Sequence, residues 1–103
     1  MINRVVLVGR MTKEIELRKT GEGKSVGSMT LAVDRYVKDH EKMSDFIPCV
    51  VWGATADNMV KYTAKGSLVA VEGRIQVRKY QNKQGENRYA TEVVCDTVQF
   101  LSR

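Results

Sequence analysis

Several residue types that define other classes of protein are scarce in this sequence. Its 103 residues include one proline, two cysteines and one histidine. Cys49 and Cys95 lie in separate apolar runs without CxxC spacing, which indicates buried free thiols in a reducing compartment and not a zinc site. No apolar run approaches the roughly 20 residues of a membrane span, and the first residues show no signal-peptide pattern. We therefore expect a cytoplasmic protein with no metal, no cofactor and no membrane association.

The residues that many enzymes use for catalysis are also sparse. His40 lies in a polar segment, residues 38–44, where a solvated loop position is expected. Carboxylates are not clustered in the way that two-metal hydrolysis requires. The sequence therefore does not favour a small nuclease, and we expect no enzymatic activity.

What the sequence has in excess is positive charge. Lysine and arginine number 17 against 12 aspartates and glutamates, a formal charge of +5. Such a balance favours a polyanionic partner, nucleic acid before an anionic membrane surface, although many unrelated domains share it. The length suffices for one hydrophobic core, so residues 1–103 are expected to form a single domain.

The segment 45–52, DFIPCVVW, carries the most informative pattern in the chain. With the period of two of a strand, Ile47, Cys49 and Val51 share one apolar, compact face that suits a core. The other face then carries Phe46 and Trp52, about 20 Å apart at roughly 3.3 Å per residue. Two exposed aromatics on one strand of a basic protein would form a stacking platform for bases. From the pattern alone, the alternative that both aromatics face the core stays open.

Four further apolar runs predict strands, and one segment predicts a helix. The other strands are expected at residues 2–10, 26–37, 67–80 and 89–96, with a hairpin tip at 20–23 and kinks at Gly9 and Gly73. Helical spacing appears between the third and fourth strands at Ala56, Met59, Val60 and Thr63, and Lys65-Gly66 is the expected stop. This order predicts an all-β fold, a five-stranded Greek-key barrel of the OB type with one short helix that covers a barrel end.

Positive charge is concentrated around the expected hairpin that joins the last two strands. Residues 74–88 contain Tyr80, one acid and five basic residues, which are Arg74, Arg78, Lys79, Lys83 and Arg88. This composition is typical of a hairpin that follows the phosphates of a single strand; a solvated hairpin is the alternative. We add Arg10 and Arg35 to the candidate DNA contacts. Tyr36, near the end of the second strand, is either an aromatic at the barrel rim or a third stacking residue.

Six short motifs resemble the bacterial single-stranded DNA-binding protein family, in the form typical of Gram-positive bacteria and their mobile elements. They are Asn3-Arg-Val-Val-Leu-Val-Gly-Arg10, Thr30-Leu-Ala-Val33, Asp45-Phe-Ile-Pro-Cys-Val-Val-Trp-Gly53, Lys65-Gly-Ser67, Glu72-Gly-Arg74 and Tyr89-Ala-Thr-Glu-Val-Val94. The resemblance implies that Phe46, Trp52 and Tyr80 stack on bases. It further implies that Arg74, Arg78, Lys79 and Arg88 line the DNA path. It also implies a homotetramer, a dimer of dimers, in which the first strand pairs two subunits through Asn3, Val5, Val6, Leu7 and Val8.

The function that this resemblance implies is sequence-independent binding and protection of single-stranded DNA in replication, recombination, repair or DNA uptake. Two other functions are considered. One is a primosomal accessory protein of the same fold, against which Phe46 and Trp52 argue. The other is an adaptor whose aromatic face binds protein, which a comparison of single-stranded with duplex DNA would separate from the main interpretation.

Three features depart from the family pattern. The family commonly has an aromatic residue at the end of the second strand, where this chain has Tyr36-Val37. We therefore expect this contact to be shifted or weakened. Pro48 stands where a polar residue is usual, and because it removes a backbone donor we expect a strand edge or a bulge there. The chain stops at Arg103 without the flexible tail whose acidic tip recruits other proteins, so partners recruited through such a tail are not expected.

Overall fold

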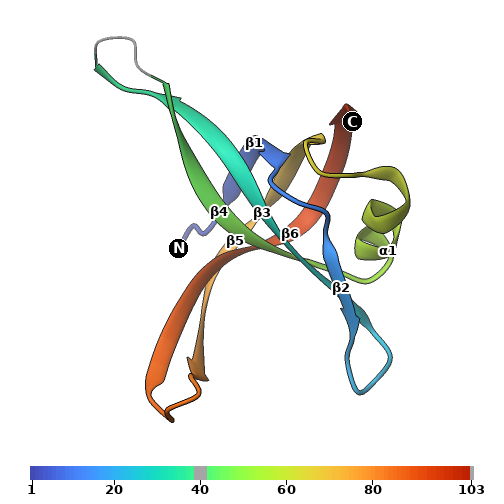
Figure 1. Cartoon of the computed structure of the whole chain (residues 1–103), viewed down its shortest axis with the longest axis vertical. Coiled ribbons are helices and arrows are strands. Elements are labelled where there is room, and N and C mark those ends of the chain that lie inside the picture. Colours follow the sequence, from blue (N-terminus) through green and yellow to red (C-terminus); the bar gives the residue numbers. More distant parts are fainter. Residues whose placement is uncertain (39–41, 103) are drawn as a thin grey trace.

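Alternating apolar residues form the strands of a small barrel in the computed structural model, which describes residues 1–38 and 42–102 (Figure 1). The elements, in chain order, are β1 (Val5–Met11), β2 (Glu16–Lys19), β3 (Ser25–Tyr36), β4 (Lys42–Trp52), α1 (Gly53–Tyr62), β5 (Leu68–Gln81) and β6 (Asn87–Ser102). The five predicted strands and the predicted helix are all present. The prediction for His40 lies outside the described residues.

Five of the strands close into a barrel. β1 pairs with β5 from Val5 to Arg10 and with β3 at Arg10 and Met11, and the other neighbours follow the order β5-β6-β4-β3. β4 and β6 are parallel over three residue pairs, whereas the remaining neighbours are antiparallel. The predicted all-β, OB-type barrel with one helix between the third and fourth long strands is confirmed.

The short strand β2 was not predicted from the sequence. It pairs with the first residues of β3 and forms a hairpin with it. The predicted tip is present, since the backbone N–H of Thr20 donates to the Lys24 carbonyl and that of Gly23 donates to the Thr20 carbonyl. This hairpin places residues 16–24 beside the start of β3 and not in a free loop.

Both predicted glycine kinks lie where two strands approach too closely for a side chain. A Cβ atom at Gly9 would lie 2.7 Å from the carbonyl oxygen of Ala32, near the point where β1 passes from β5 to β3. At Gly73 a Cβ atom would overlap the carbonyl of Val94, and the register of β5 against β6 shifts at this residue. These two positions allow the strands to bend into a closed barrel.

The two faces of β4 are arranged as the alternating pattern predicts. Cys49 and Val51 are buried and Ile47 packs against the core, whereas Phe46 and Trp52 are 65% and 46% exposed. The alternative in which both aromatics face the core is therefore wrong. At Pro48, β4 pairs with β3 alone, because its ladder with β6 begins at the next residue. The proline thus lies at a strand edge, as expected.

Helix α1 covers one end of the barrel, but its buried stripe is narrower than predicted. Ala56 and Met59 are buried, whereas Val60 is 50% exposed. The helix also ends before the expected stop at Lys65-Gly66, since Thr63 is already extended and the N–H of Gly66 donates to the Met11 carbonyl. The assignment of Val60 to the buried stripe is therefore wrong. Its position fits the helical spacing, but the side of the helix that faces the barrel is occupied by Ala56 and Met59.

The core contains both cysteines as free thiols, as predicted. It is formed by Met11, Met29, Leu31, Cys49, Val51, Ala56, Met59, Val69, Val71, Val93 and Cys95. A hydrogen bond with Cys95, and then burial, raise the pKa of the Cys49 thiol, so it stays protonated at neutral pH. Among the described helices none is long and apolar enough to cross a membrane.

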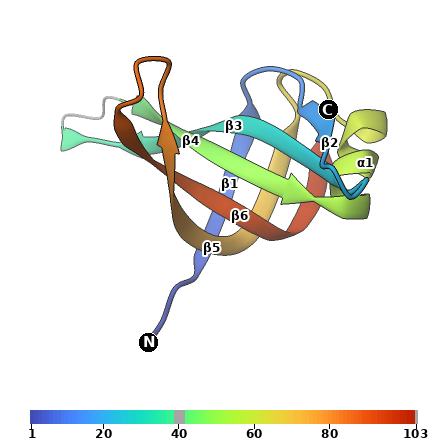
Figure 2. The ribbon, with the colours of Figure 1, turned by 90° about the horizontal axis from the view of Figure 1, so that it is seen from below.

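Two long hairpins extend from the barrel on the side away from α1. In Figures 1 and 2 the β3–β4 and β5–β6 hairpins diverge from the barrel, with α1 at the other end. We call these two hairpins the arms. Each arm is a continuation of strands that also build the barrel. β4 pairs with β3 on one side and with β6 on the other, and β3 pairs in turn with β2. The outer face of β4 therefore adjoins both long hairpins and the β2–β3 hairpin.

Candidate nucleic-acid interface

The outer face of β3 and β4 carries two aromatic rings above a low floor. Phe46 lies opposite Ala32 in the β3–β4 ladder, and Trp52 lies six residues further along the strand. Between the rings, the outward residues are Pro48 and Val50 on β4 and their partners Thr30 and Ser28 on β3. Opposed residues of an antiparallel pair share a face. Because these four side chains are smaller than the aromatic rings, the two rings project further from the sheet than the surface between them.

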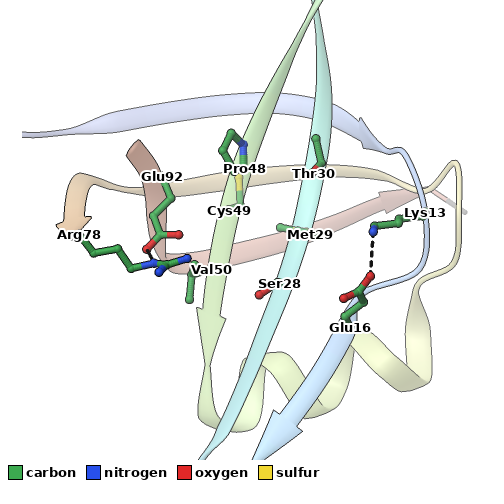
Figure 3. Close-up of a pocket in the computed structure, with 10 residues that line it drawn as sticks. All are labelled: Lys13, Glu16, Ser28, Met29, Thr30, Pro48, Cys49, Val50, Arg78 and Glu92. Atoms are coloured by element: carbon green, nitrogen blue, oxygen red, sulfur yellow. Dashed lines mark hydrogen bonds and ion pairs between the residues drawn. The ribbon is translucent and has the colours of Figure 1, made fainter. Parts of the chain in front are cut away.

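A hollow of about 200 Å³ lies over the stretch of β3 and β4 between Phe46 and Trp52, although neither ring lines it. Figure 3 shows the side chains that do. The floor of the hollow includes Ser28, Thr30, Pro48 and Val50. Figure 3 shows an ion pair on each side of the floor, Lys13 with Glu16 on one and Arg78 with Glu92 on the other. The volume of the hollow is below the roughly 300–1,000 Å³ of a pocket that encloses a small ligand.

Trp52 is flanked by further hollows at the end of β4. One, of about 560 Å³, is lined by Lys19, Gly23, Lys24, Ser25, Trp52, Gly53, Ala54 and Asp57. Within it, the Lys19 ammonium donates to the Ser25 hydroxyl at 2.8 Å, and that hydroxyl donates to the Asp57 carboxylate at 2.6 Å. This chain of hydrogen bonds ties the β2–β3 hairpin to α1 and fixes the wall beside the indole.

Lys13, Lys19 and Lys24 are candidate contacts that the sequence analysis missed. They lie within residues 11–24, which appeared as a charged segment that leads to a hairpin tip. The tip itself was the available signal, because a hairpin needs a strand on each side of its turn. Once β2 is in place, these lysines line the hollows around Trp52 and between the two rings.

The β5–β6 hairpin divides its predicted contacts between two faces. Tyr80 opposes Arg88, and the Arg78 guanidinium carbon lies 5.5 Å from the Tyr80 ring centroid, a cation–π geometry. Lys79 has the opposite parity and lies beside Tyr89, whose side chain is exposed. The structure therefore brings Arg78, Tyr80 and Arg88 together on one face of the hairpin. Lys79 lies on the other face, and its contact with DNA stays a prediction.

Most of the predicted arginines are neutralised by a nearby acid. The pairs are Arg35 with Asp45, Arg74 with Asp96, Arg78 with Glu92 and Arg88 with Glu86, at 2.9, 3.6, 3.0 and 3.5 Å. Lys79 and Lys83 form no ion pair with any described residue. In the pairs of Arg35, Arg74 and Arg88 both partners are exposed, and such pairs contribute little to stability, roughly 0–1 kcal/mol. A phosphate can replace the acid in these three pairs at low cost.

Tyr36 and Arg10 lie on the same face as Phe46. Along β3, Tyr36 and Ala32 share a parity, and Tyr36 opposes Lys42 at the end of the ladder. Arg10 pairs with Ala32 in the β1–β3 contact, so it extends the row that begins at Phe46, and its guanidinium donates to the Gly66 carbonyl at 2.9 Å. Tyr36 is 82% exposed, which suits a third stacking residue better than a ring packed at the rim.

Two charged residues, Asp34 and Lys42, form an ion pair next to Tyr36 at the outer end of the β3–β4 hairpin. The Ser44 hydroxyl and the Lys42 ammonium both donate to Asp34 and lower the pKa of its carboxyl. Asp34 in turn raises the pKa of Lys42. Arg35, of the opposite parity, is held by Asp45 on the other face of the arm. Arg35 is thus separated from the aromatic row, and its contact with DNA stays a prediction.

Nothing in the described residues suggests a metal centre. Residues 1–38 and 42–102 hold no group of three or more His, Cys, Asp or Glu side chains that could bind a metal ion. The site that the structure does present is a row of exposed rings with cations along its edges. Such a surface can stack on unpaired bases and contact their phosphates.

Comparison with known proteins gives consistent matches. The model of the single-strand binding protein family matches residues 2–101. Single-stranded DNA-binding protein 1 of Lactococcus lactis subsp. lactis (strain IL1403) is 50% identical over 103 residues, 98% of this chain and 69% of that protein. Single-stranded DNA-binding protein 1 of Staphylococcus aureus (strain COL) is 53% identical over 103 residues, 98% and 62% of the two chains. Single-stranded DNA-binding protein 1 of Streptococcus pyogenes serotype M18 (strain MGAS8232) is 48% identical over 105 residues, 100% and 81%.

Proposed function

Because the chain belongs to the single-strand binding protein family, we propose that its aromatic groove binds single-stranded DNA without regard to base sequence. The observation that carries this proposal is the pair of exposed rings, Phe46 and Trp52, on one face of β4. Every base has a π-face, so stacking tolerates any sequence and contributes roughly 1–3 kcal/mol per base. The chain spans 62% to 81% of the length of the three relatives named above, so the proposal concerns the domain that they share.

The groove binds a strand by two kinds of contact. Phe46, Trp52, Tyr80 and Tyr36 stack on bases, and the cations beside them, among them Arg10, Arg78, Lys24 and Lys19, contact phosphates. The Arg10 guanidinium already donates to the Gly66 carbonyl, so its contact with a phosphate exchanges an internal hydrogen bond for an ionic one. Duplex DNA conceals the faces of its bases, and the groove therefore selects unpaired strands. In this way the protein coats and protects single strands in the cytoplasm during replication, recombination, repair or uptake.

Binding to DNA tests this proposal directly. We expect an oligo-dT to bind far more tightly than a duplex of the same length, and its affinity to fall linearly with the logarithm of salt concentration as counterions are released. Fluorescence anisotropy of labelled oligonucleotides across a salt series measures both properties. Equal affinity for duplex and single strand would show that the aromatic row does not stack on bases.

Assembly is proposed to proceed through the free edge of β1. Between Val5 and Gly9, β1 pairs with β5 on one side, and its other edge meets β3 only at Arg10 and Met11. Val6 and Val8 are 64% and 51% exposed. Such an apolar, unpaired edge is a template for another strand. A copy of β1 pairs with it across a twofold axis, and two such dimers form the homotetramer.

The contacts around β1 support this arrangement. The Asn3 side chain both donates to the Ile75 carbonyl and accepts from the Ile75 N–H at 2.9 Å, which fixes the start of the chain against β5. Val5 and Leu7 line an almost wholly apolar hollow of about 300 Å³ with Ile47, Ile75 and Val93. A second subunit would remove this apolar surface from water.

Substitution of lysine for both Val6 and Val8 is expected to break the assembly into monomers of 11.6 kDa. Two charges on each edge would repel the same charges on the copy and would prevent burial of the valines. Light scattering at micromolar concentration measures the mass. Val60→Lys, at an equally exposed valine on α1, is the control and should leave the mass unchanged. A monomeric wild-type chain would contradict the proposed interface.

A further inference from the structure

Glu92 places a nearly buried carboxylate at the edge of a groove that is proposed to bind a polyanion. Only 8% of its side chain is exposed, yet it lines the hollow between Phe46 and Trp52 together with Pro48 and Val50 (Figure 3). A negative charge at this place repels phosphate, and burial makes it costly to keep. The hydrogen bonds that the Glu92 carboxylate accepts from neighbouring side chains offer a reason for an acid at this position.

The carboxylate fixes one arginine. Glu92 Oε1 accepts a hydrogen bond from Arg78 Nε at 3.0 Å and a longer one from Gln76 Nε2 at 3.5 Å. The register explains this contact, because Gln76 lies directly opposite Glu92 and Arg78 lies one pair further along the same face. The same guanidinium is positioned over the Tyr80 ring, 5.5 Å from its centroid. Carboxylate, guanidinium and ring therefore form one row across the hairpin.

The bond to Nε leaves the outer donors of Arg78 free. A guanidinium has five N–H donors in a rigid plane, and the Nε–H is the one nearest the chain. The hydrogen bond to Glu92 uses Nε, neither terminal nitrogen donates to another described residue, and 54% of the arginine side chain is exposed. Lysine could not replace this arrangement, since its ammonium has neither the plane nor a second point of attachment.

We propose that Glu92 is a positioning residue for DNA binding: it holds Arg78 over Tyr80 so that one unit stacks on a base and contacts the adjoining phosphate. The inference rests on the proposed function, because the unit acts only when single-stranded DNA lies in the groove. It reverses the expectation from charge alone. Removal of an acid from this surface would strengthen binding if Glu92 contributed nothing but repulsion, and weakens binding if it positions Arg78.

Four single variants, one double variant and a labelled oligo-dT separate these possibilities. Glu92→Ala is expected to weaken binding about two- to fivefold, the contribution of an oriented cation–π contact, while Glu92→Gln keeps an acceptor for Nε and restores binding to the wild-type level or above it. Glu86→Ala is the matched control, because it removes an exposed acid paired with Arg88 in the same hairpin. It should bind as tightly as the wild type or more tightly. Thermal unfolding confirms that each variant is folded.

The fourth variant, Arg78→Ala, completes a double-mutant cycle with Glu92→Ala. If Glu92 acts through Arg78, its removal no longer weakens binding in the Arg78→Ala background. An equal loss in both backgrounds would show a general structural role, and tighter binding by Glu92→Ala would show simple repulsion; either result overturns the inference. A wild-type chain that fails to bind oligo-dT overturns the proposed function as well, whereas normal wild-type binding with no effect at Glu92 overturns this inference alone.

Discussion

Replacement of Trp52 by alanine is expected to weaken binding of oligo-dT by roughly 1–3 kcal/mol while the fold stays intact. The indole lies on the outer face of β4, and its residue caps α1 through the backbone without a side-chain hydrogen bond. The substitution therefore removes a stacking surface and no capping hydrogen bond of the helix. Because Trp52 is the single tryptophan, stacking of a base should also quench its emission when DNA is added to the wild type.

The effect should be additive with that of Phe46. The two rings are about 20 Å apart along β4 at roughly 3.3 Å per residue, and separated sites usually contribute independently. The double variant is therefore expected to lose roughly 2–6 kcal/mol of binding free energy. Tyr62→Ala is the control, since Tyr62 is an exposed aromatic on α1 that packs on Phe100 and lines none of the hollows around the groove. A loss of the folded circular dichroism signal in Trp52→Ala would contradict this account.

Alanine at Gly73 is expected to lower the free energy of unfolding by about 3 kcal/mol or more. The added methyl group would overlap the carbonyl of Val94, a backbone group of β6 that cannot rotate away. Relief would require β5 and β6 to separate at the bulge, where β5 also bonds to β1. Chemical denaturation at a fixed protein concentration measures the loss, because the proposed assembly contributes to apparent stability.

The control for Gly73 is Gly21, at the tip of the β2–β3 hairpin. No atom lies within 4 Å of a Cβ built at Gly21, so Gly21→Ala should change the stability little. If Gly73→Ala unfolds at the same denaturant concentration as Gly21→Ala, the close approach of β5 and β6 is not required in solution.

The parts of the fold that follow from local pattern could be predicted. Alternation in residues 45–52 placed Phe46 and Trp52 outward, because only the set of Ile47, Cys49 and Val51 is compact enough for the core. Gly9 and Gly73 marked the bends, since a glycine within an apolar strand has few other uses. The order of the strands and the helix predicted the OB-type barrel, and both the family resemblance and the geometry agree with it.

The parts that depend on contacts between distant residues could not be predicted. β2 has four exposed residues and no apolar alternation, so the tip at residues 20–23 was its one sequence signal, and the lysines around Trp52 were missed with it. Likewise, the neutralisation of Arg78 by Glu92 joins residues 14 positions apart on two strands. Lys79 was grouped with Arg78 by proximity in sequence, although the pleat directs it to the opposite face.

The pairing of β1 with β5 also has a consequence for synthesis on the ribosome. Asn3 and Ile75, which the pairing brings into contact, are 72 positions apart. At roughly 5–20 residues per second, β1 emerges on the order of 4–14 s before its partner exists. The β3–β4 and β5–β6 hairpins join neighbouring segments and can form as they appear, whereas Val6, Leu7 and Val8 must wait. During that interval the nascent chain exposes an unpaired apolar strand, the kind of segment that is prone to pair with another chain.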